Sequence, residues 1–349
     1  MNGDIILTSS KSMFENLNIS LPANNEIILD DLGNPSVMVK IPKFRYCDLF
    51  TGGSTKTHPA FIVGSKEVDY IYISKYPNVV VNNRGYSLPG QVPADCMTYD
   101  EAIAYCENKG KGWHLMSRAE WAAIALWCKK HDTQPFGNNK YGYDYYHTND
   151  SGIIKEEYRE DWSDNVQFTL TGTGPKDWYH NHDYSGIADL NGNVAEWVSG
   201  VRLNNGEIQI IANNDVANHP DQTASSSAWK AILQNGNLVA PGTDNTLKFM
   251  SGGKIGTGAA GSFSGQFKNI AGNTGITIPE LLKGLALCPA DAAETYKNDY
   301  FYAGSGTDRV CYCGGWYHAE SRAGVFYCSL LDDRSAYFDL GFRSAYVPL

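Results

Sequence analysis

The residues of this chain best suited to catalysis or soft-metal binding are its cysteines. The chain has eight of them, at positions 47, 96, 106, 128, 288, 311, 313 and 328. None forms a CxxC pair, so the spacing does not indicate a four-thiolate zinc site. Cys311 and Cys313 are too close in sequence for an easy disulfide with each other. The pattern predicts buried free thiols in a protein made in a reducing cytoplasm.

Hard-metal ligands are concentrated in one other place. Asp189, Asn191 and Asn193 alternate like the ligands of a calcium loop, because calcium prefers oxygen donors. The alternative is a tight turn built from Asn and Gly, with Glu196 and Trp197 in the core. We therefore expect no required cofactor and keep calcium as a candidate ligand.

Composition excludes two classes of partner. The chain has 28 basic and 38 acidic residues, a net charge of −10, whereas binding to a phosphate backbone needs clustered Lys and Arg. We therefore expect no nucleic-acid partner. Nor does any stretch approach the roughly 18 apolar residues of a membrane helix, and the N-terminus lacks the pattern of a secretory signal. The expectation is a protein made in the cytoplasm, without membrane insertion.

The C-terminal segment, about residues 314–345, has the composition of a recognition surface. Its frame is Gly314-Gly315, Arg334-Ser335 and Gly341-Phe-Arg343. The residues between follow neither the period of a helix nor the alternation of a half-buried strand. This pattern indicates a rigid scaffold that carries side chains free to vary.

Within this segment, aromatic residues offer large rigid contact area and polar residues offer directional contacts, as in antibody loops. The predicted ligand-binding residues are Trp316, Tyr317, His318, Ser321, Arg322, Tyr327, Ser329, Leu331, Asp332, Asp333, Ala336, Tyr337, Phe338 and Asp339. The alternative for each aromatic is a place in the core. For the core itself we predict Phe326, Leu330, Leu340 and Phe342. Arg334 and Arg343 are expected to tie the scaffold, because a guanidinium can bridge several carbonyls.

The elements that must position these residues are many and short. Strands are predicted at 37–41, 61–63 and 70–74, which are rich in β-branched and aromatic residues. Thr98 and Glu101 form a capping-box pattern that opens a helix to about Lys109. Ser117 and Glu120 open a second helix to about Lys130 by the same pattern. The fold class is α+β, with many short strands, two helices and long loops.

Six landmarks in order carry a family resemblance. They are Thr98-Tyr-Asp-Glu-Ala-Ile-Ala-Tyr-Cys106, His114-Leu-Met-Ser-Arg-Ala-Glu-Trp121, Pro135-Phe-Gly-Asn138, Asp189-Leu-Asn-Gly-Asn-Val-Ala-Glu-Trp197, Gly314-Gly315 and Gly341-Phe-Arg343. Together they resemble the formylglycine-generating-enzyme branch of the C-type lectin fold. The resemblance implies one such domain over 37–349, with an insertion at about 205–290. Residues 1–36 are then an N-terminal extension or small segment.

The tail resembles a narrower group, the variable proteins of diversity-generating retroelements. The resemblance lies in Ala303-Gly-Ser-Gly306, Tyr312-Cys-Gly-Gly315, Ala323-Gly-Val-Phe-Tyr327 and Gly341-Phe-Arg-Ser-Ala345. It implies a hypervariable ligand-binding segment at about 314–345, carried by a phage tail or virion protein or found at a cell surface. The implied partners are a host-surface protein or glycan, phage tail proteins and further copies of the same chain.

The parent enzymes use two cysteines, and the resemblance places them at Ala319 and Gly324. Without a thiolate, neither position offers a nucleophile or a soft copper ligand. We therefore expect no enzyme activity. The alternatives are a degenerate oxidase of the formylglycine type and a bacterial surface adhesin.

Overall fold

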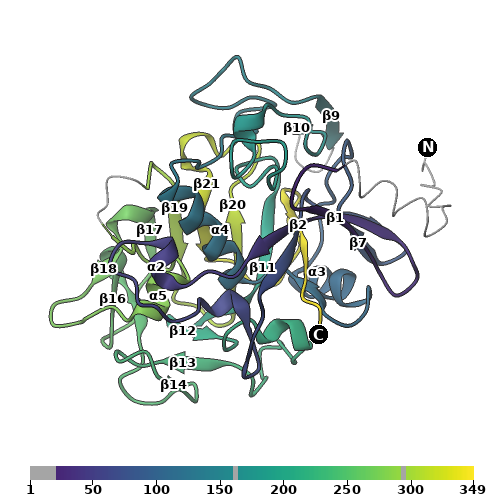
Figure 1. The fold of residues 1–349 in the computed structure, drawn as a ribbon. Coiled ribbons are helices and arrows are strands. Elements are labelled where there is room, and N and C mark those ends of the chain that lie inside the picture. Colours follow the sequence, from purple (N-terminus) through teal and green to yellow (C-terminus); the bar gives the residue numbers. More distant parts are fainter. Residues whose placement is uncertain (1–20, 160–163, 292–295) are drawn as a thin grey trace.

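The computed structural model describes residues 21–349 except 160–163 and 292–295, and within them the chain folds as a mixture of short strands and a few helices (Figure 1). The predicted α+β class is confirmed. The first twenty residues of the predicted N-terminal segment lie outside the described part. Residues Asn25–Leu29 form a strand, β1, which pairs with β2, so this part of the segment belongs to the main fold.

Within the described residues, the helices are two long ones, α3 and α4, and two of a single turn, α2 and α5. Their bounds are α2 Tyr46–Leu49, α3 Tyr99–Glu107, α4 Arg118–Lys130 and α5 Glu280–Gly284. Short 3-10 turns lie at Pro59–Phe61, Lys176–Trp178, Asp215–Asn218, Ser251–Gly253, Phe267–Asn269 and Glu320–Arg322.

The smaller of the two main sheets has the strand order β1-β2-β5-β23-β8. Its strands are β1 Asn25–Leu29, β2 Pro35–Pro42, β5 Tyr70–Ser74, β23 Ser344–Tyr346 and β8 Trp113–Leu115. Two of them, β2 and β5, cover the strands predicted at 37–41 and 70–74. The third predicted strand, 61–63, is shorter, because its first residue ends a 3-10 turn and only β3 Ile62–Val63 is extended. Strand β23, near the C-terminus, thus lies between β5 and β8 in the sheet whose edge strand is β1.

The larger sheet follows the order β17-β19-β21-β20-β11-β12-β15-β16-β18, with β13, β14 and β22 attached at its side. Its strands are β11 Ala195–Asn204, β12 Glu207–Ile210, β13 Lys230–Ile232, β14 Leu238–Val239, β15 Lys248–Met250, β16 Lys254–Gly256, β17 Phe263–Gln266, β18 Ala271–Gly272, β19 Tyr300–Ala303, β20 Arg309–Gly314, β21 Gly324–Leu330 and β22 Leu340–Phe342. Residues 205–290, expected to be an insertion, supply β12 to β18, so they extend this sheet. The remaining described strands form three hairpins. Strand β3 pairs with β4 Lys66–Glu67, β6 Val79–Val81 pairs with β7 Arg84–Tyr86, and β9 Ile154–Arg159 pairs with β10 Asp164–Thr169.

Both long helices begin at the predicted capping boxes. The Thr98 hydroxyl accepts from the Glu101 amide, and the Glu101 carboxylate accepts from the Thr98 amide. Ser117 and Glu120 make the same reciprocal pair. Such boxes satisfy amides that a helix start leaves without partners. They fix where α3 and α4 begin.

Helix α4 is the central helix of the molecule. It lies against β11 and β21 of the larger sheet (Figure 1), and the side chains predicted to be buried, Trp121, Ile124, Ala125 and Cys128, are buried. In α3 the predicted face is only partly right. Cys106 is buried, but Ile103 and Tyr105 are half-buried, and Tyr99 and Ala102 supply the rest of the contact.

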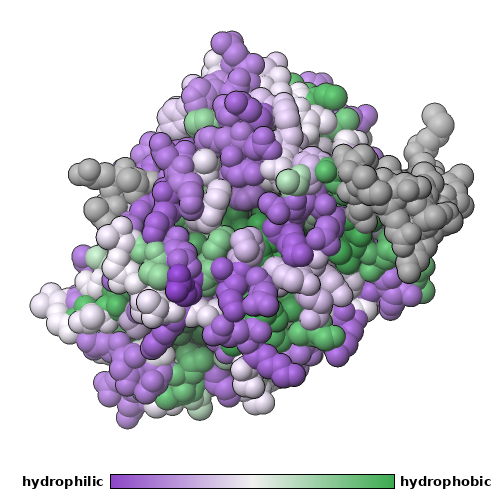
Figure 2. All heavy atoms as spheres, in the orientation of Figure 1, coloured by the Kyte–Doolittle hydropathy of each residue, from purple (hydrophilic) through white to green (hydrophobic). Residues whose placement is uncertain are grey.

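The surface seen in Figure 2 is mostly hydrophilic, with smaller apolar areas between the polar side chains. This agrees with the net charge of −10, which favours solubility. Across the described residues, no helix has the length and apolar character needed to cross a membrane.

Candidate ligand-binding site

The sequence landmarks converge on the start of the C-terminal segment. The Gly192 amide donates to the Gly314 carbonyl (3.1 Å), and the Tyr317 amide donates to the Asn193 carbonyl (3.0 Å). Both Gly314 (φ +89°) and Gly315 (φ +78°) lie in the left-handed region, which glycine enters without strain. The Gly-Gly pair therefore lets the chain turn against the loop at 189–193.

That loop uses its side chains to hold itself and its neighbours. The Asp189 carboxylate accepts from the Gly172 amide (2.7 Å). The side-chain Oδ1 atom of Asn191 accepts from the Asn139 side-chain amide (3.1 Å), and the side-chain Oδ1 atom of Asn193 accepts from the Thr169 backbone amide (2.9 Å). All three residues are buried. These bonds support the turn interpretation, with Glu196 and Trp197 buried as expected. Calcium at this loop stays a prediction.

Beyond the Gly-Gly pair, aromatic and acidic side chains gather on one face of β19, β20 and β21. Tyr302 and Tyr312 both lie opposite Ser329 in the sheet register, and opposite residues on neighbouring strands point to the same side. We call this set the tyrosine face. Its members are Tyr302, Tyr312, Trp316, Tyr327, Asp332, Tyr337 and Asp339.

The rings of the tyrosine face contact one another around Tyr327. Its ring centroid lies 5.8 Å from those of Tyr302 and Trp316 and 6.3 Å from that of Tyr312. Arg322 lies over the Trp316 ring, 5.5 Å from its centroid. Aromatic pairs in such geometries stabilise each other beyond their buried area. The face is therefore a rigid aromatic platform.

Carboxylates border this platform and are held close to the tyrosines. The Tyr312 hydroxyl donates to Asp332 Oδ2 (2.7 Å). Burial raises the pKa of Tyr312 well above its usual range, and the Asp332 carboxylate adds to that rise. Burial also raises the pKa of Asp339 to about 6, with a further contribution from the charges of Asp95 and Asp332. The platform thus combines apolar area with hydrogen-bond acceptors.

A cleft of about 390 Å³ adjoins the tyrosine face. Ala94 and Met97 line it and belong to the same hydrophobic cluster as Trp316 and Tyr337. Asp95 also lines the cleft, and its charge contributes to the raised pKa of Asp339. The cleft gives a ligand seated on the platform a concave place for one of its groups.

Eleven of the fourteen predicted binding residues reach solvent wholly or in part. They are Trp316, His318, Ser321, Arg322, Leu331, Asp332, Asp333, Ala336, Tyr337, Phe338 and Asp339. The structure therefore places them where a ligand can reach them.

The other three, Tyr317, Tyr327 and Ser329, are at most 1% exposed, so the expectation of direct ligand contact is corrected for them. The reason is long-range packing. Tyr317 lies in edge contact with Phe168 and Tyr141, with ring centroids 5.7 Å away in both cases. Tyr327 lies beneath the rings around it, and Ser329 lies between Tyr302 and Tyr312 in the sheet.

Sequence reasoning missed Tyr302 and Tyr312, which precede the frame of the C-terminal segment. A signal for them exists in the alternation of Tyr300-Phe-Tyr302 and Cys311-Tyr-Cys313, because side chains in a strand point to opposite faces in turn. In the first run Tyr300 and Tyr302 point to the same side of the sheet. In the second run Tyr312 points to the side opposite its two cysteine neighbours.

The predicted scaffold residues hold the segment in place. Phe326, Leu330, Leu340 and Phe342 are buried. Arg334 donates to Asp308 (2.6 Å), to Asp100 (2.6 Å) and to the Gln222 carbonyl (2.7 Å). Arg343 likewise donates to the backbone carbonyls of Ser74 and Ala188, so both arginines act as expected.

The two positions at which the resemblance places the catalytic cysteines, Ala319 and Gly324, are closed. Ala319 is fully buried. A Cβ atom at Gly324 would lie 2.2 Å from a carboxylate oxygen of Asp299, and Asp299 itself is only 3% exposed and accepts from the Phe326 amide (2.9 Å). The carboxylate of Asp299 thus fills the space that a cysteine side chain at 324 needs.

Comparison with known proteins places this fold in a family. The profile of the sulfatase-modifying factor enzyme 1-like domain (FGE-sulfatase) matches residues 66–252, more than half of the chain. The chain belongs to this family, and the fold expected for the formylglycine-generating-enzyme branch is confirmed. The match runs past residue 205 and ends before the C-terminal segment.

Solved structures similar to the chain include two whose comparison covers 94% of this chain and all of the other. PvdO from Pseudomonas aeruginosa has 14% sequence identity and a TM-score of 0.37. Treponema denticola variable protein 1 has 12% identity and a TM-score of 0.36. No curated protein matches the sequence.

Proposed function

We propose that this chain is a non-catalytic ligand-binding protein whose tyrosine face receives a protein or glycan. The observation that carries the proposal is the platform itself, in which Tyr302, Tyr312 and Trp316 surround Tyr327 and acids stand at the border. Rigid aromatics lose little side-chain entropy on binding and are frequent energetic centres of interfaces. Acidic acceptors beside them give directional contacts to hydroxyl, amide or cationic groups.

The absence of enzyme activity is part of the same proposal. Ala319 and Gly324 carry no thiol, and the space beside Gly324 is taken by Asp299. A thiol oxidase of the formylglycine type needs both cysteines as nucleophile and metal ligands. The residues present support a binding role on a scaffold shared with enzymes.

The resemblance of the tail extends the proposal to its origin. Residues 314–345 are a segment diversified by a retroelement, and the carrier is a phage tail or virion protein that binds a host surface. A homo-oligomer on such a particle would multiply weak contacts through avidity. Contact with further tail proteins and a virion or cell-surface location belong to the same proposal. So do the lack of a nucleic-acid partner and of any required cofactor.

The test begins with the DNA beside the gene. We expect a near-copy of the codons for about residues 314–345, which differs only where the copy has adenine, next to a reverse-transcriptase gene. If neither is present, the diversification proposal fails and a fixed binder remains.

The binding role is tested separately with the full chain on arrays of host-surface glycans and proteins. We expect retention that is lost in Tyr337→Ala and kept in Lys268→Ala, a control variant at a partly exposed position outside the segment. Thiol oxidation of a cysteine peptide by the copper-supplemented chain would instead establish the oxidase alternative.

A further inference from the structure

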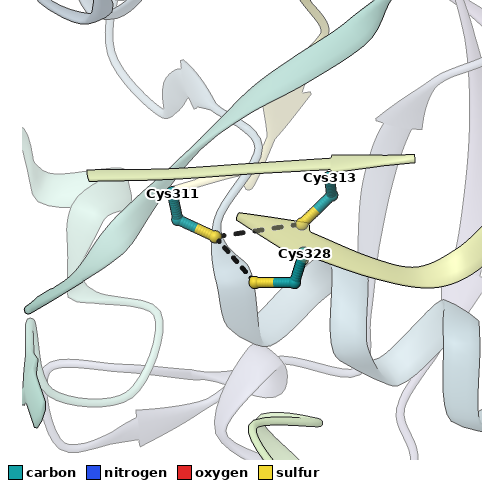
Figure 3. A group of neighbouring side chains, drawn as sticks. All are labelled: Cys311, Cys313 and Cys328. Carbon is teal, nitrogen blue, oxygen red and sulfur yellow. Dashed lines mark hydrogen bonds between the residues drawn. The ribbon is translucent and has the colours of Figure 1, made fainter. Parts of the chain in front are cut away.

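The same two strands that carry the tyrosine face bring three cysteine sulfurs together on their other side. Cys311 and Cys313 lie two residues apart in β20 and point to one face, and Cys328 lies opposite Cys313 on β21. Figure 3 shows the three side chains pointing toward one another from the two strands. The Cys311 Sγ atom is 3.4 Å from that of Cys328 and 3.9 Å from that of Cys313.

The spacing of these sulfurs fits a single ion. All three lie within 4.8 Å of one another and all three residues are fully buried. Thiolates bound to one zinc ion at ~2.3 Å stand about 3.8 Å apart, which falls within the range observed here. An ion at the centre of the group thus requires little movement of β20 or β21.

An independent observation comes from Arg118 on α4. Its side chain is 1% exposed, and its Nη1 atom lies 2.9 Å from Cys313 Sγ. Its other hydrogen bonds go to the carbonyl oxygens of Leu285 and Ala286. Within the described part of the chain, Arg118 has no carboxylate partner. A buried cation needs a compensating negative charge, and thiolates in the sulfur group supply it.

We propose that Cys311, Cys313 and Cys328 bind one thiophilic d10 metal ion as three thiolates, with Arg118 as a buried counter-charge. Soft sulfur ligands select Cu(I) and Zn(II) over hard ions. Zn(II) with three thiolates and one guanidinium gives a neutral group, whereas Cu(I) suits the three-ligand count. Binding releases the protons of those cysteines that enter as thiols, so it strengthens as the pH rises.

This site is distinct from the catalytic pair of the family, which corresponds to Ala319 and Gly324. It is also independent of the ligand-binding proposal, because it lies on the opposite side of β20 and β21 from the tyrosine face. Since the sulfurs are closed to solvent, the ion enters as the chain folds. Metal binding is then coupled to stability.

The experiment uses the full chain refolded under reducing, anaerobic conditions with Zn(II) in one arm and Cu(I) in the other. Bound metal is measured by mass spectrometry of the intact folded protein and by competition with a chromophoric chelator. We expect one ion per chain in at least one arm and an increase in Tm with that ion. The arm that binds identifies the metal.

The variants Cys311→Ser, Cys313→Ser and Cys328→Ser should each lose most of the bound metal. Cys288→Ser, another buried cysteine outside the group, should retain it. If a serine variant does not fold, the matching alanine variant is tested, and cobalt(II) absorption of the parent reports thiolate ligation directly. Absence of metal in both arms would overturn the proposal. So would retention of metal by all three variants.

Discussion

Arg343 and Glu196 form a fully buried, bidentate ion pair that ties the end of the chain to β11. The Arg343 Nε atom donates to Glu196 Oε2 (2.6 Å) and Nη2 donates to Oε1 (2.5 Å). The same guanidinium donates to the carbonyls of Ser74 (3.0 Å) and Ala188 (3.1 Å). One side chain therefore joins β5, the loop before β11 and the C-terminal segment.

Removing one partner of this pair should be costly. Arg343→Met leaves the Glu196 carboxylate buried without its counter-charge, and we expect the free energy of unfolding to fall by about 3–5 kcal/mol. Denaturant titration measures the loss. The double variant Arg343→Met with Glu196→Leu should lose less than the single variant, because no charge stays buried alone. A double variant that is less stable than Arg343→Met would contradict this account.

Tyr317 and Tyr337 should behave differently although both are tyrosines of the C-terminal segment. Tyr317 is fully buried, so Tyr317→Ala should lower the free energy of unfolding by about 3–5 kcal/mol. Tyr337 is half-exposed on the tyrosine face, so Tyr337→Ala should cost under about 1 kcal/mol. Thermal denaturation of the two variants, side by side, decides. Equal losses would place Tyr337 in the core.

Asp299 should make stability depend on pH. Burial raises the pKa of this carboxyl to about 7, against the hydrogen bond from the Phe326 amide. The unfolded carboxyl titrates at ~3.9, so between these two pKa values the folded chain holds one proton more than the unfolded chain. The stability that this proton contributes is therefore fully present below pH 4 and is lost as the pH rises to 7. Over that range the free energy of unfolding falls by at most about 1.4 kcal/mol per pH unit.

The control for this effect is Asp299→Asn, whose side-chain oxygen still accepts from the Phe326 amide. Its free energy of unfolding should vary less between pH 4 and 7 than that of the parent chain. Denaturant titrations across this range give the two slopes. Identical slopes would assign the pH dependence to other groups.

Gly324 should not accept a side chain while Asp299 is present. A Cβ at this position lies 2.2 Å from the carboxylate, and the backbone φ of +154° lies at the edge of the range that disfavours side chains. We expect Gly324→Ala to cost about 1–3 kcal/mol through overpacking. Adding Asp299→Ala should return part of that loss, as measured by denaturant titration. No recovery would mean that the backbone angle is the source of the cost.

For the same reason, restoring both cysteines should not restore chemistry. The pair Ala319→Cys and Gly324→Cys introduces one thiol into a fully buried position and the other against Asp299. We expect no oxidation of a cysteine peptide when copper and oxygen are supplied. Product formation, followed by mass spectrometry, would show that the scaffold keeps an intact catalytic pocket.

Local signals were readable from the sequence. The Thr98 and Ser117 capping boxes set the starts of α3 and α4 because their bonds span only three residues. The scaffold role of Arg334 and Arg343 was also predictable, because a guanidinium has enough donors to bridge several carbonyls. Ordered landmarks gave the family, which no single element defines.

Contacts between distant segments were not readable. Tyr317 is buried because Phe168 and Tyr141 pack against it, and the sequence around residue 317 does not indicate these distant contacts. All eight cysteines were expected to be buried thiols, but only six of them are buried, while Cys47 is half-buried and Cys96 is exposed. The convergence of Cys311 and Cys313 with Cys328 depends on the pairing of β20 with β21, which spacing alone does not reveal.

The anchors of the C-terminal segment have a consequence for how it can evolve. Arg334 is bound to Asp308 and Asp100, and Arg343 is bound to Glu196, so both ends of the stretch between them are fixed by partners outside it. A stretch held at both ends tolerates the exchange of one residue for another far better than an insertion or a deletion, which would pull an anchor from its partner. The positions of this stretch that reach solvent, 335–339, can therefore change in residue type, whereas its length is fixed by the two anchors.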